Sequence, residues 1–383
     1  MITVNHGLWQ AETGWLKALP ADGDPSLLLV FAPAELLRLP ILDELRAAWP
    51  QALLLGCSTA GQICDVQMHD DILVVTALRF EHTRLQMAEA HLPSAEDSRR
   101  VGLQLAQALM QPDLKHVLVL AEGLAINGSA LVDGIESGLP EAVTVSGGLA
   151  GDGGDFVETL ICTRSGVFSR YIAAIGLYGS SLRVGCGSCG GWDPFGPERL
   201  ITRSSGNELF EMDGQPALDL YAHYLGDYAA GLPATGLLFP LEIRLPGQEQ
   251  TLVRTILGTH PERRSLIFAG DIPEGAYARL MKTNFEHLLD GAAQAAISSL
   301  VPLGGGLSPQ AALLVSCIGR KMVLKQRTEE ELEEVSQALG ADAALTGFYS
   351  YGEIAPGVVP CESELHNQTM TVTVLAEVDP RDG

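Results

Sequence analysis

Hydrophobic and polar positions follow one plan in three separate parts of the chain. In each part, an apolar run of strand length leads through a helical pattern to a second short apolar run, which is the pattern of a βαβ unit. In the first unit the predicted strands are 26–31 and 52–55, with a helix over 36–49 between them. In the second unit the strands are 116–121 and 142–145, with a helix that begins near Asn127. In the third unit the strands are 311–317 and 343–345, with a helix over 328–339. Each unit implies two parallel strands joined by a right-handed crossover.

The helix over 328–339 has the clearest boundaries. Thr328 and Glu331 have the spacing of a capping box, in which a hydroxyl and a carboxylate bond to backbone N–H groups of the first turn. Gly340 follows the last apolar position, where glycine commonly ends a helix. In the second unit, Asn127 is a good N-cap residue. We therefore expect Glu331 to act as a cap.

Small and hydroxyl residues with glycines follow the second strand of each unit, at 56–61, 146–152 and 346–352. Ligand sites of parallel sheets lie beyond the carboxyl ends of the strands, so we expect these three glycine turns to line one cleft. A second polar cluster, near 366–369, interrupts the apolar C-terminal segment. The candidate ligand-binding residues are Gly56, Cys57, Ser58, Thr59, Gly61, Gly147, Gly148, Asp152, Trp192, Tyr351, Glu353 and Asn367.

The segments between the units predict antiparallel strands and a second lobe. A turn at 213–216 precedes a helical pattern over 217–225, and 277–300 reads as one long helix. The predicted antiparallel strands are 72–80, 156–162, 171–178, 182–186 and 369–374. Together these elements predict a mixed α/β fold with repeated βαβ units and long mixed sheets.

The composition and net charge of the chain argue against some classes of binding partner. The 383 residues include 46% hydrophobic and 19% charged residues, as in a folded globular protein, and the formal net charge is -23. Such a charge repels nucleic acid and anionic lipid. Residues 1–10 lack the features of a secretory leader, and the seven cysteines are an odd number, so we expect free thiols in the cytoplasm.

The glycine-rich motifs, taken in order, resemble the FIST family of bacterial sensory proteins. The matching motifs are 56–61, 146–152, Gly190–Pro197, Leu232–Pro240, Ser316–Arg320 and the polar clusters of the C-terminal segment. The resemblance implies two closely associated lobes, with an N-terminal segment at 1–25, a FIST N domain at 26–214, a FIST C domain at 215–379 and a tail at 380–383. One departure is Lys325, where the family pattern has glycine.

The same resemblance implies a function. FIST proteins are regarded as small-ligand input modules of signal transduction and not as enzymes. The likeness is strongest to the branch named NosP, for nitric oxide sensing proteins. It implies haem b as a cofactor, a sensor histidine kinase as the partner regulated in trans, and room for a homodimer. A sensor of amino acids or other small metabolites, without haem, is the alternative.

Haem would need an axial ligand. The resemblance points to His366, which shares even-numbered spacing with Met370 and would face inward if one strand ran through both. His223 is the alternative, because Asp219 lies four residues earlier on a predicted helix and could orient the imidazole. His366 is equally compatible with a core histidine bonded to neighbouring backbone.

Two further motifs admit a different chemistry. Cys57 or Ser58 could be the nucleophile of a hydrolase or transferase, although the sequence places no histidine beside them. Cys186 and Cys189 have the spacing of half a zinc site, but no second Cys or His pair is near, which favours structural thiols. We therefore expect a binding protein, with the enzyme as the hypothesis from another class.

Overall fold

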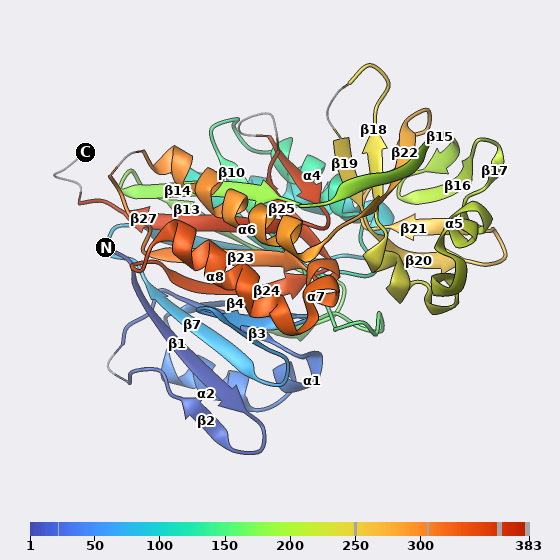
Figure 1. Cartoon of the computed structure of the whole chain (residues 1–383). Helices are drawn as coiled ribbons and strands as arrows, with labels where there is room; N and C mark the ends of the chain where they lie inside the picture. Colours follow the sequence, from blue (N-terminus) through green and yellow to red (C-terminus); the bar gives the residue numbers. More distant parts are fainter. Residues whose placement is uncertain (22, 249–250, 305, 358–361, 380–383) are drawn as a thin grey trace.

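Three sheets packed around a shared core form the body of the protein in the computed structural model, and a fourth sheet forms a second lobe (Figure 1). The structure describes residues 1–21, 23–248, 251–304, 306–357 and 362–379. The predicted tail at 380–383 and Cys361 lie outside these residues. The mixed α/β class and the three βαβ units predicted from the sequence are confirmed.

The three core sheets share one strand order. Each has a parallel pair in the middle, one antiparallel strand beside its first member and another beside its second. The first sheet has the order β12 (Gly166–Phe168), β11 (Ile161–Thr163), β4 (Leu53–Ser58), β3 (Leu27–Ala32), β7 (Leu73–Arg79), β1 (Thr3–Gln10), β2 (Gly14–Lys17). The second has the order β26 (Ser363–His366), β25 (Gly352–Pro356), β10 (Thr144–Leu149), β9 (Leu114–Ala121), β13 (Tyr171–Tyr178), β8 (Arg84–His91).

The third sheet combines distant parts of the chain. Its parallel pair and one neighbour come from the C-terminal half, whereas three strands come from the N-terminal half. The order is β14 (Leu182–Cys189), β27 (Met370–Glu377), β23 (Ala311–Cys317), β24 (Ala344–Ser350), β5 (Gln62–Cys64), β6 (Gln67–His69). The two halves of the chain therefore share one core.

The ends of the three units interlock around a pseudo-threefold axis. The strand that follows each parallel pair crosses to the next unit and pairs there antiparallel, so that β5 pairs with β24, β25 with β10, and β11 with β4. A ring of three equivalent backbone hydrogen bonds closes the arrangement, from Ala60 N to Tyr349 O (2.9 Å), from Gly151 N to Ser58 O (3.0 Å) and from Tyr351 N to Leu149 O (3.2 Å). We call these three bonds the corner ring.

The crossover helices cover the outer faces of the sheets. The helix predicted over 36–49 is two helices, α1 (Ala34–Leu37) and α2 (Ile41–Ala48), because Pro40 has no N–H to continue the first one. In the second unit, Asn127 caps α4 (Gly128–Glu136) as predicted, its side chain accepting from Ala130 N. The third unit has α7 (Ile318–Leu324) and α8 (Thr328–Leu339), and α3 (Ser98–Leu109) packs beside α4.

The capping box predicted for α8 is wrong. Arg327 occupies the N-cap position without a side-chain cap, and the Thr328 hydroxyl donates to Lys325 O. Glu331 is instead fully buried and faces Arg320 on α7. Lys325 adopts φ 54°, a conformation typical of the glycine expected there, so the backbone turn is kept despite the different residue.

The second lobe consists of residues 193–282. Its sheet has the order β19 (Thr251–Arg254), β18 (Leu241–Arg244), β22 (Tyr277–Lys282), β15 (Asp193–Ser205), β16 (Glu208–Met212), β21 (Ser265–Phe268), β20 (Ile256–His260), with β17 (Gln215–Pro216) beside β16 and α5 (Ala217–Leu225) packed on it. The long helix predicted over 277–300 is wrong in its first part, which is β22. The helix α6 (Phe285–Leu300) begins after Asn284, whose side chain caps it.

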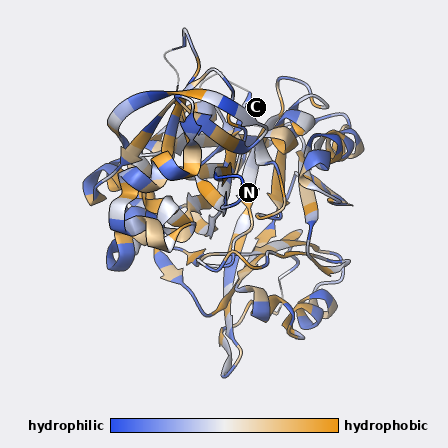
Figure 2. Cartoon of the chain, turned by 90° about the vertical axis from the view of Figure 1, so that its right-hand side faces the viewer, coloured by the Kyte–Doolittle hydropathy of each residue, from blue (hydrophilic) through white to orange (hydrophobic). Residues whose placement is uncertain are grey.

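Hydrophobic and hydrophilic residues alternate along the helices as well as along many strands, as expected of elements with one buried face (Figure 2). The central cluster takes side chains from all three core sheets, including Phe31, Leu120 and Phe348. Phe31 and Phe348 stack with ring centroids 4.8 Å apart. Within the described residues, no helix has the length and apolar character needed to cross a membrane.

The glycines at 56, 147 and 347 occupy equivalent positions, and each lies against a backbone carbonyl of the neighbouring parallel strand. A Cβ added to Gly147 would lie 1.8 Å from Val119 O, and its φ of 140° is strained for other residues.

We expect Gly147→Ala to lower the free energy of unfolding by about 3 kcal/mol, measured by chemical denaturation. The control Gly154→Ala, with open space around the new Cβ, should change it by less than about 0.5 kcal/mol. Equal effects of the two changes would contradict the close-approach argument.

Candidate functional site

The predicted glycine turns are strand ends. Gly56, Cys57 and Ser58 belong to β4, while Gly147 and Gly148 belong to β10. These residues are fully buried, and the space beside their glycines is filled by protein atoms: a Cβ on Gly148 would lie 2.6 Å from Val315 Cγ1. The glycines therefore make room for neighbouring strands.

The residues just beyond these strand ends border a cleft of about 340 Å³. Thr59, Gly61 and Asp152 line it, so the structure brings together three of the predicted ligand-binding residues, from two of the glycine turns. The expectation that the third turn, 346–352, lines the same cleft is wrong, because its residues are buried behind it. We call this space the corner cleft. It is lined by Pro33, Ala34, Glu35, Thr59, Ala60, Gly61, Asp70, Asp152, Gly153, Asp155, Val157, Glu158 and Lys321.

Asp152 holds one wall of the corner cleft in place. Its Oδ2 accepts from Val157 N (2.7 Å) and Glu158 N (2.8 Å), and its Oδ1 accepts from Phe156 N (3.1 Å) and from the Tyr351 hydroxyl. This loop explains why the strand predicted over 156–162 forms only at β11. Asp152 therefore shapes the cleft and links its wall to the end of β24.

Negative charge dominates the corner cleft. Five carboxylates line it against one ammonium group, that of Lys321, which donates to Ala60 O (2.7 Å) and pairs with Asp70. Glu158 pairs with Arg38. In the described part of the chain, Glu35 and Asp155 have no hydrogen-bond or ion-pair partner, and both are exposed. The cleft thus offers two free carboxylates to a ligand.

A fully buried ion pair lies behind the corner cleft. Arg320 Nε donates to Glu331 Oε2 (2.9 Å), and Glu331 Oε1 accepts from the Tyr349 hydroxyl (2.7 Å) and from Ser316 Oγ (3.1 Å). The remaining guanidinium nitrogens donate to backbone carbonyls, including Leu288 O (2.7 Å). Each side-chain nitrogen of Arg320 and each carboxylate oxygen of Glu331 has a hydrogen-bond partner, which is the condition for a buried pair to be tolerated. It fixes α7, α8 and β24 relative to one another.

Glu353 is buried without a cation bonded to it. Its carboxyl group accepts from Ser350 Oγ (2.5 Å), Thr369 N (3.1 Å) and Thr369 Oγ1 (3.0 Å). Burial raises the pKa of Glu353 to about 8, because removal from water penalises the charged form more than these bonds favour it. Glu353 lies behind the corner ring and does not line the cleft.

His366 lies on a separate cavity of about 450 Å³. The expectation that one strand runs from His366 through Met370 is wrong: β26 belongs to the second sheet and β27 to the third, and Gln368, with φ 65°, lies between them. The His366 Nε2 contacts Ala355 O (3.2 Å), and burial lowers the pKa of the ring. This His366 cavity is lined by Thr144, Val184, Cys186, Gly187, Ser188, Ser298, Pro302, Pro356, Gly357 and His366.

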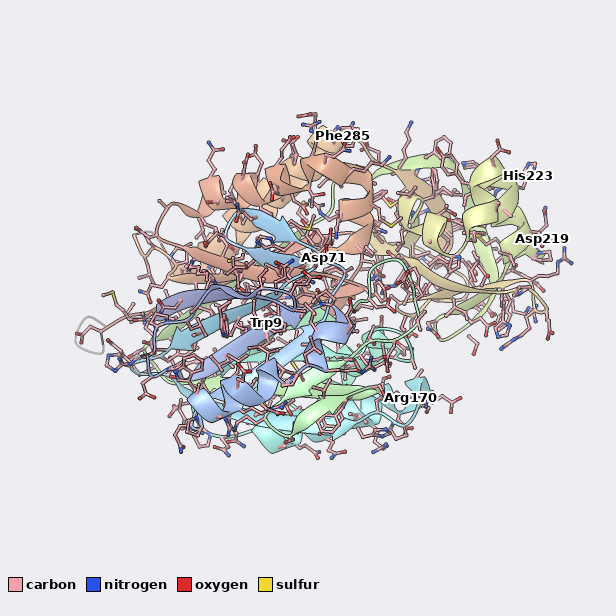
Figure 3. The ribbon with its side chains drawn as sticks, turned by 90° about the horizontal axis from the view of Figure 1, so that it is seen from below. Trp9, Asp71, Arg170, Asp219, His223 and Phe285 are labelled. Carbon is pink, nitrogen blue, oxygen red and sulfur yellow. The ribbon has the colours of Figure 1, made fainter. Side chains whose placement is uncertain are left out.

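The remaining predicted residues lie away from both cavities. His223 is exposed on the second lobe, and Asp219, expected to orient it, pairs with Arg264 instead (Figure 3). Trp192 packs in a small apolar cluster and donates from Nε1 to Gln368 O (2.9 Å). Asn367 is buried, and its Oδ1 accepts from Thr255 N (3.3 Å).

The proposed nucleophiles are enclosed by the core. Cys57 and Ser58 are both 0% exposed, and burial raises the pKa of the Cys57 thiol. Ser58 Oγ accepts from Leu160 N (2.9 Å). At the described positions the cysteines are free thiols, and Cys186 and Cys189 lie on β14, a strand of the third sheet.

Sequence reasoning missed the charged residues that give the corner cleft its character. Glu35 follows β3, Asp155 follows β10 and Lys321 follows β23, so all three lie past the carboxyl ends of strands. The rule that located the glycine turns applied equally to these positions. The pairing of Arg320 with Glu331 could not be predicted by this rule, because the position of Glu331 in the sequence fits a helix cap equally well.

Comparisons with known proteins agree with the motif analysis. Models of the FIST N domain and the FIST C domain match residues 26–215 and 217–356, respectively. The boundary between these matches falls inside the second lobe. Among solved structures, a crystal structure of cyanuric acid hydrolase from A. caulinodans is similar over 99% of each chain, with 10% identity and a TM-score of 0.38. No curated protein matched the chain.

The raised pKa of Glu353 makes a prediction about stability. Between about pH 5 and pH 8 the folded chain keeps a proton on Glu353 that the unfolded chain has lost, so this group weakens stability as pH rises. From pH 5 to pH 8, the free energy of unfolding of Glu353→Gln should therefore rise by on the order of 2–4 kcal/mol relative to that of wild type. Denaturant titrations at both pH values measure this. A difference independent of pH would refute the assignment, and the exposed control Glu262→Gln should show no such gain.

Proposed function

Because the chain belongs to the FIST-domain proteins, whose domains sense small ligands in signalling, we propose that it is a cytoplasmic sensor that binds its ligand in the corner cleft. The observation that supports this site is that the segments following β3, β4 and β10 line one open, polar cleft. Ligand sites of sheets with parallel strands form at such ends. The role is binding and not catalysis, since Cys57 and Ser58 have no access to solvent.

The charge of the cleft selects the class of ligand. Glu35 and Asp155 are carboxylates without a partner among the described residues, so they favour a ligand with an amino group. The Lys321 ammonium group borders the same space and suits a carboxylate or another acceptor. Amino acids and related small metabolites have this combination of groups.

The corner ring offers a route from ligand to output. The cleft is lined by residues that come directly after β4 and β10 in the sequence. Tyr351, just past the end of β24, bonds to Asp152 and to Gly153 O. A ligand that binds one arrangement of these ends more tightly than another shifts the population toward it. The output is delivered in trans to a sensor histidine kinase or another signalling protein, with the chain acting alone or as a homodimer.

Removing the free carboxylates should weaken ligand binding. A panel of amino acids and small amines, screened by thermal shift and then titrated by calorimetry, identifies the ligand. Asp155→Asn and Glu35→Gln should each lower its affinity about tenfold, because each removes a charge-assisted hydrogen bond. Glu262→Gln, an exposed acid of the second lobe, is the matched control. Unchanged affinity in both cleft variants would disprove the corner cleft as the site.

Haem-based nitric oxide sensing is the second candidate, and the His366 cavity is the specific observation in its favour. The corner cleft does not fit haem, because its described lining has no histidine, cysteine, methionine or tyrosine to serve as an axial ligand. The described lining of the His366 cavity has no charged side chain, burial lowers the pKa of its imidazole, and the cavity is large enough for a small-molecule ligand. Haem iron supplies an open coordination position for nitric oxide. His366 would hold it through Nδ1, since Nε2 contacts Ala355 O.

The haem candidate has a direct spectroscopic test. Protein purified with haem supplied, or titrated with haem, should show a saturable Soret band, and His366→Ala should shift that band or abolish it. His223→Ala, on the second lobe, should leave the band unchanged. Absence of saturable binding would eliminate haem while leaving the corner cleft hypothesis intact.

A further inference from the structure

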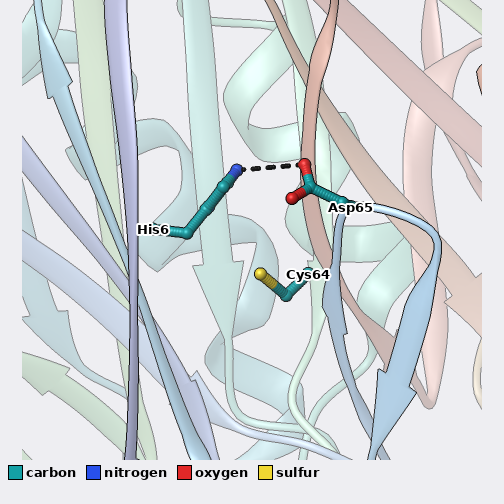
Figure 4. Close-up of side chains that lie close together, drawn as sticks. All are labelled: His6, Cys64 and Asp65. Carbon is teal, nitrogen blue, oxygen red and sulfur yellow. Dashed lines mark ion pairs between the residues drawn. The ribbon is translucent and has the colours of Figure 1, made fainter. Parts of the chain in front are cut away.

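Three potential metal ligands meet where the first and third sheets join. His6 lies on β1, Cys64 ends β5, and Asp65 follows it; their ligand atoms all lie within 4.8 Å of one another. Figure 4 shows the His6 ring and the Asp65 carboxylate facing each other, with the Cys64 thiol beside them. The cluster lies outside the linings of the corner cleft and the His366 cavity.

The hydrogen bonds of His6 determine where its proton lies. Nδ1 lies 3.1 Å from Thr76 Oγ1, and Thr76 donates its own hydroxyl proton to Thr346 Oγ1 (2.7 Å). Thr76 Oγ1 must then accept from Nδ1, which leaves a lone pair on Nε2 of the neutral ring. His6 is only 7% exposed, and its Nε2 is buried without a hydrogen-bond partner among the described residues. A metal-ligating histidine is oriented in the same way, by a bond from its other nitrogen.

The lone pair faces a carboxylate. His6 Nε2 lies 3.4 Å from Asp65 Oδ1, a contact between two acceptors that is repulsive unless a proton or a cation lies between them. Two ligands at about 2.0–2.1 Å from a tetrahedral zinc ion are about 3.3–3.4 Å apart, so this separation already suits coordination. The Cys64 thiol has to approach by about 1 Å to complete three ligands.

We propose that His6 Nε2, Cys64 Sγ and Asp65 Oδ1 form a binding site for Zn²⁺. The set of one nitrogen, one sulfur and one oxygen favours zinc over Mg²⁺ or Ca²⁺, which prefer oxygen ligands alone. Coordination releases the thiol proton of Cys64 to solvent. The Asp65 side chain is 54% exposed, which gives the ion a path from solvent and leaves the fourth position to water.

The bound ion would join β1 to β5. These strands are far apart in sequence and belong to different sheets, and His6, through Thr76 and Thr346, already connects the two sheets by hydrogen bonds. Zinc would thus fix the N-terminal strand against the third βαβ unit. This role is independent of the ligand-sensing function.

The 383-residue chain, stripped of metal with a chelator, provides the test. Calorimetry with Zn²⁺ should give one site per chain, and Co²⁺ should produce a thiolate-to-cobalt charge-transfer band. Cys64→Ser should remove the band and weaken Zn²⁺ binding at least tenfold. Cys189→Ser, at a half-buried thiol of β14, is the control and should retain both. Mg²⁺ should not compete.

A second variant keeps the test decisive if Cys64→Ser fails to fold, as judged by circular dichroism. Asp65→Asn changes a half-exposed side chain and should also weaken Zn²⁺ binding at least tenfold. The proposal is overturned if the wild-type chain takes up no Zn²⁺, if cobalt gives no charge-transfer band, or if Asp65→Asn binds as tightly as wild type. Retained binding in every variant would place the ion elsewhere, such as among the carboxylates of the corner cleft.

Discussion

The corner ring is the constraint on which the rest of the structure depends. Each of its three backbone hydrogen bonds joins the end of one βαβ unit to the end of another, and the strand that follows each unit pairs in the sheet of another unit, so no unit completes its own sheet. Small residues at the equivalent positions Gly56, Gly147 and Gly347 let neighbouring parallel strands approach at these ends. The strands are packed closely at these ends, and the chain continues beyond β4 and β10 as short polar segments. These segments line the corner cleft.

Charge is distributed according to depth around the ring. The outermost acids, Glu35 and Asp155, have no partner among the residues that the structure describes, whereas Glu331 is neutralised by Arg320 in the interior. Glu353 lies between these extremes: it is buried, it has hydrogen bonds, and burial raises its pKa. The interior charges define the positions of α7, α8 and β24, and only the acids at the surface have interactions left to offer a ligand.

Much of the architecture could be predicted from the sequence, because the three units repeat one hydrophobic pattern. Strands β3, β9 and β23 lie where apolar runs predicted them, and Asn127 caps α4. Local patterns failed where distant contacts decide the outcome. Residues 277–282 have helical spacing but form β22 beside β15, and Glu331 has cap spacing but pairs with Arg320. Likewise, the parity that linked His366 to Met370 assumed a continuous strand, and no local signal showed that the chain changes sheets at Gln368.

The composition of the third sheet has a consequence for biosynthesis. Strands β5, β6 and β14 emerge from the ribosome long before their partners β24 and β27 are made. Until then β14 and the edge of β5 that faces away from β6 lack their partners, and these open edges are available to other nascent chains. Neither half of the polypeptide is a self-sufficient folding unit, so truncation or recombination near residue 216 would separate strands of one sheet. The two halves of the chain are therefore expected to be inherited together, as one unit.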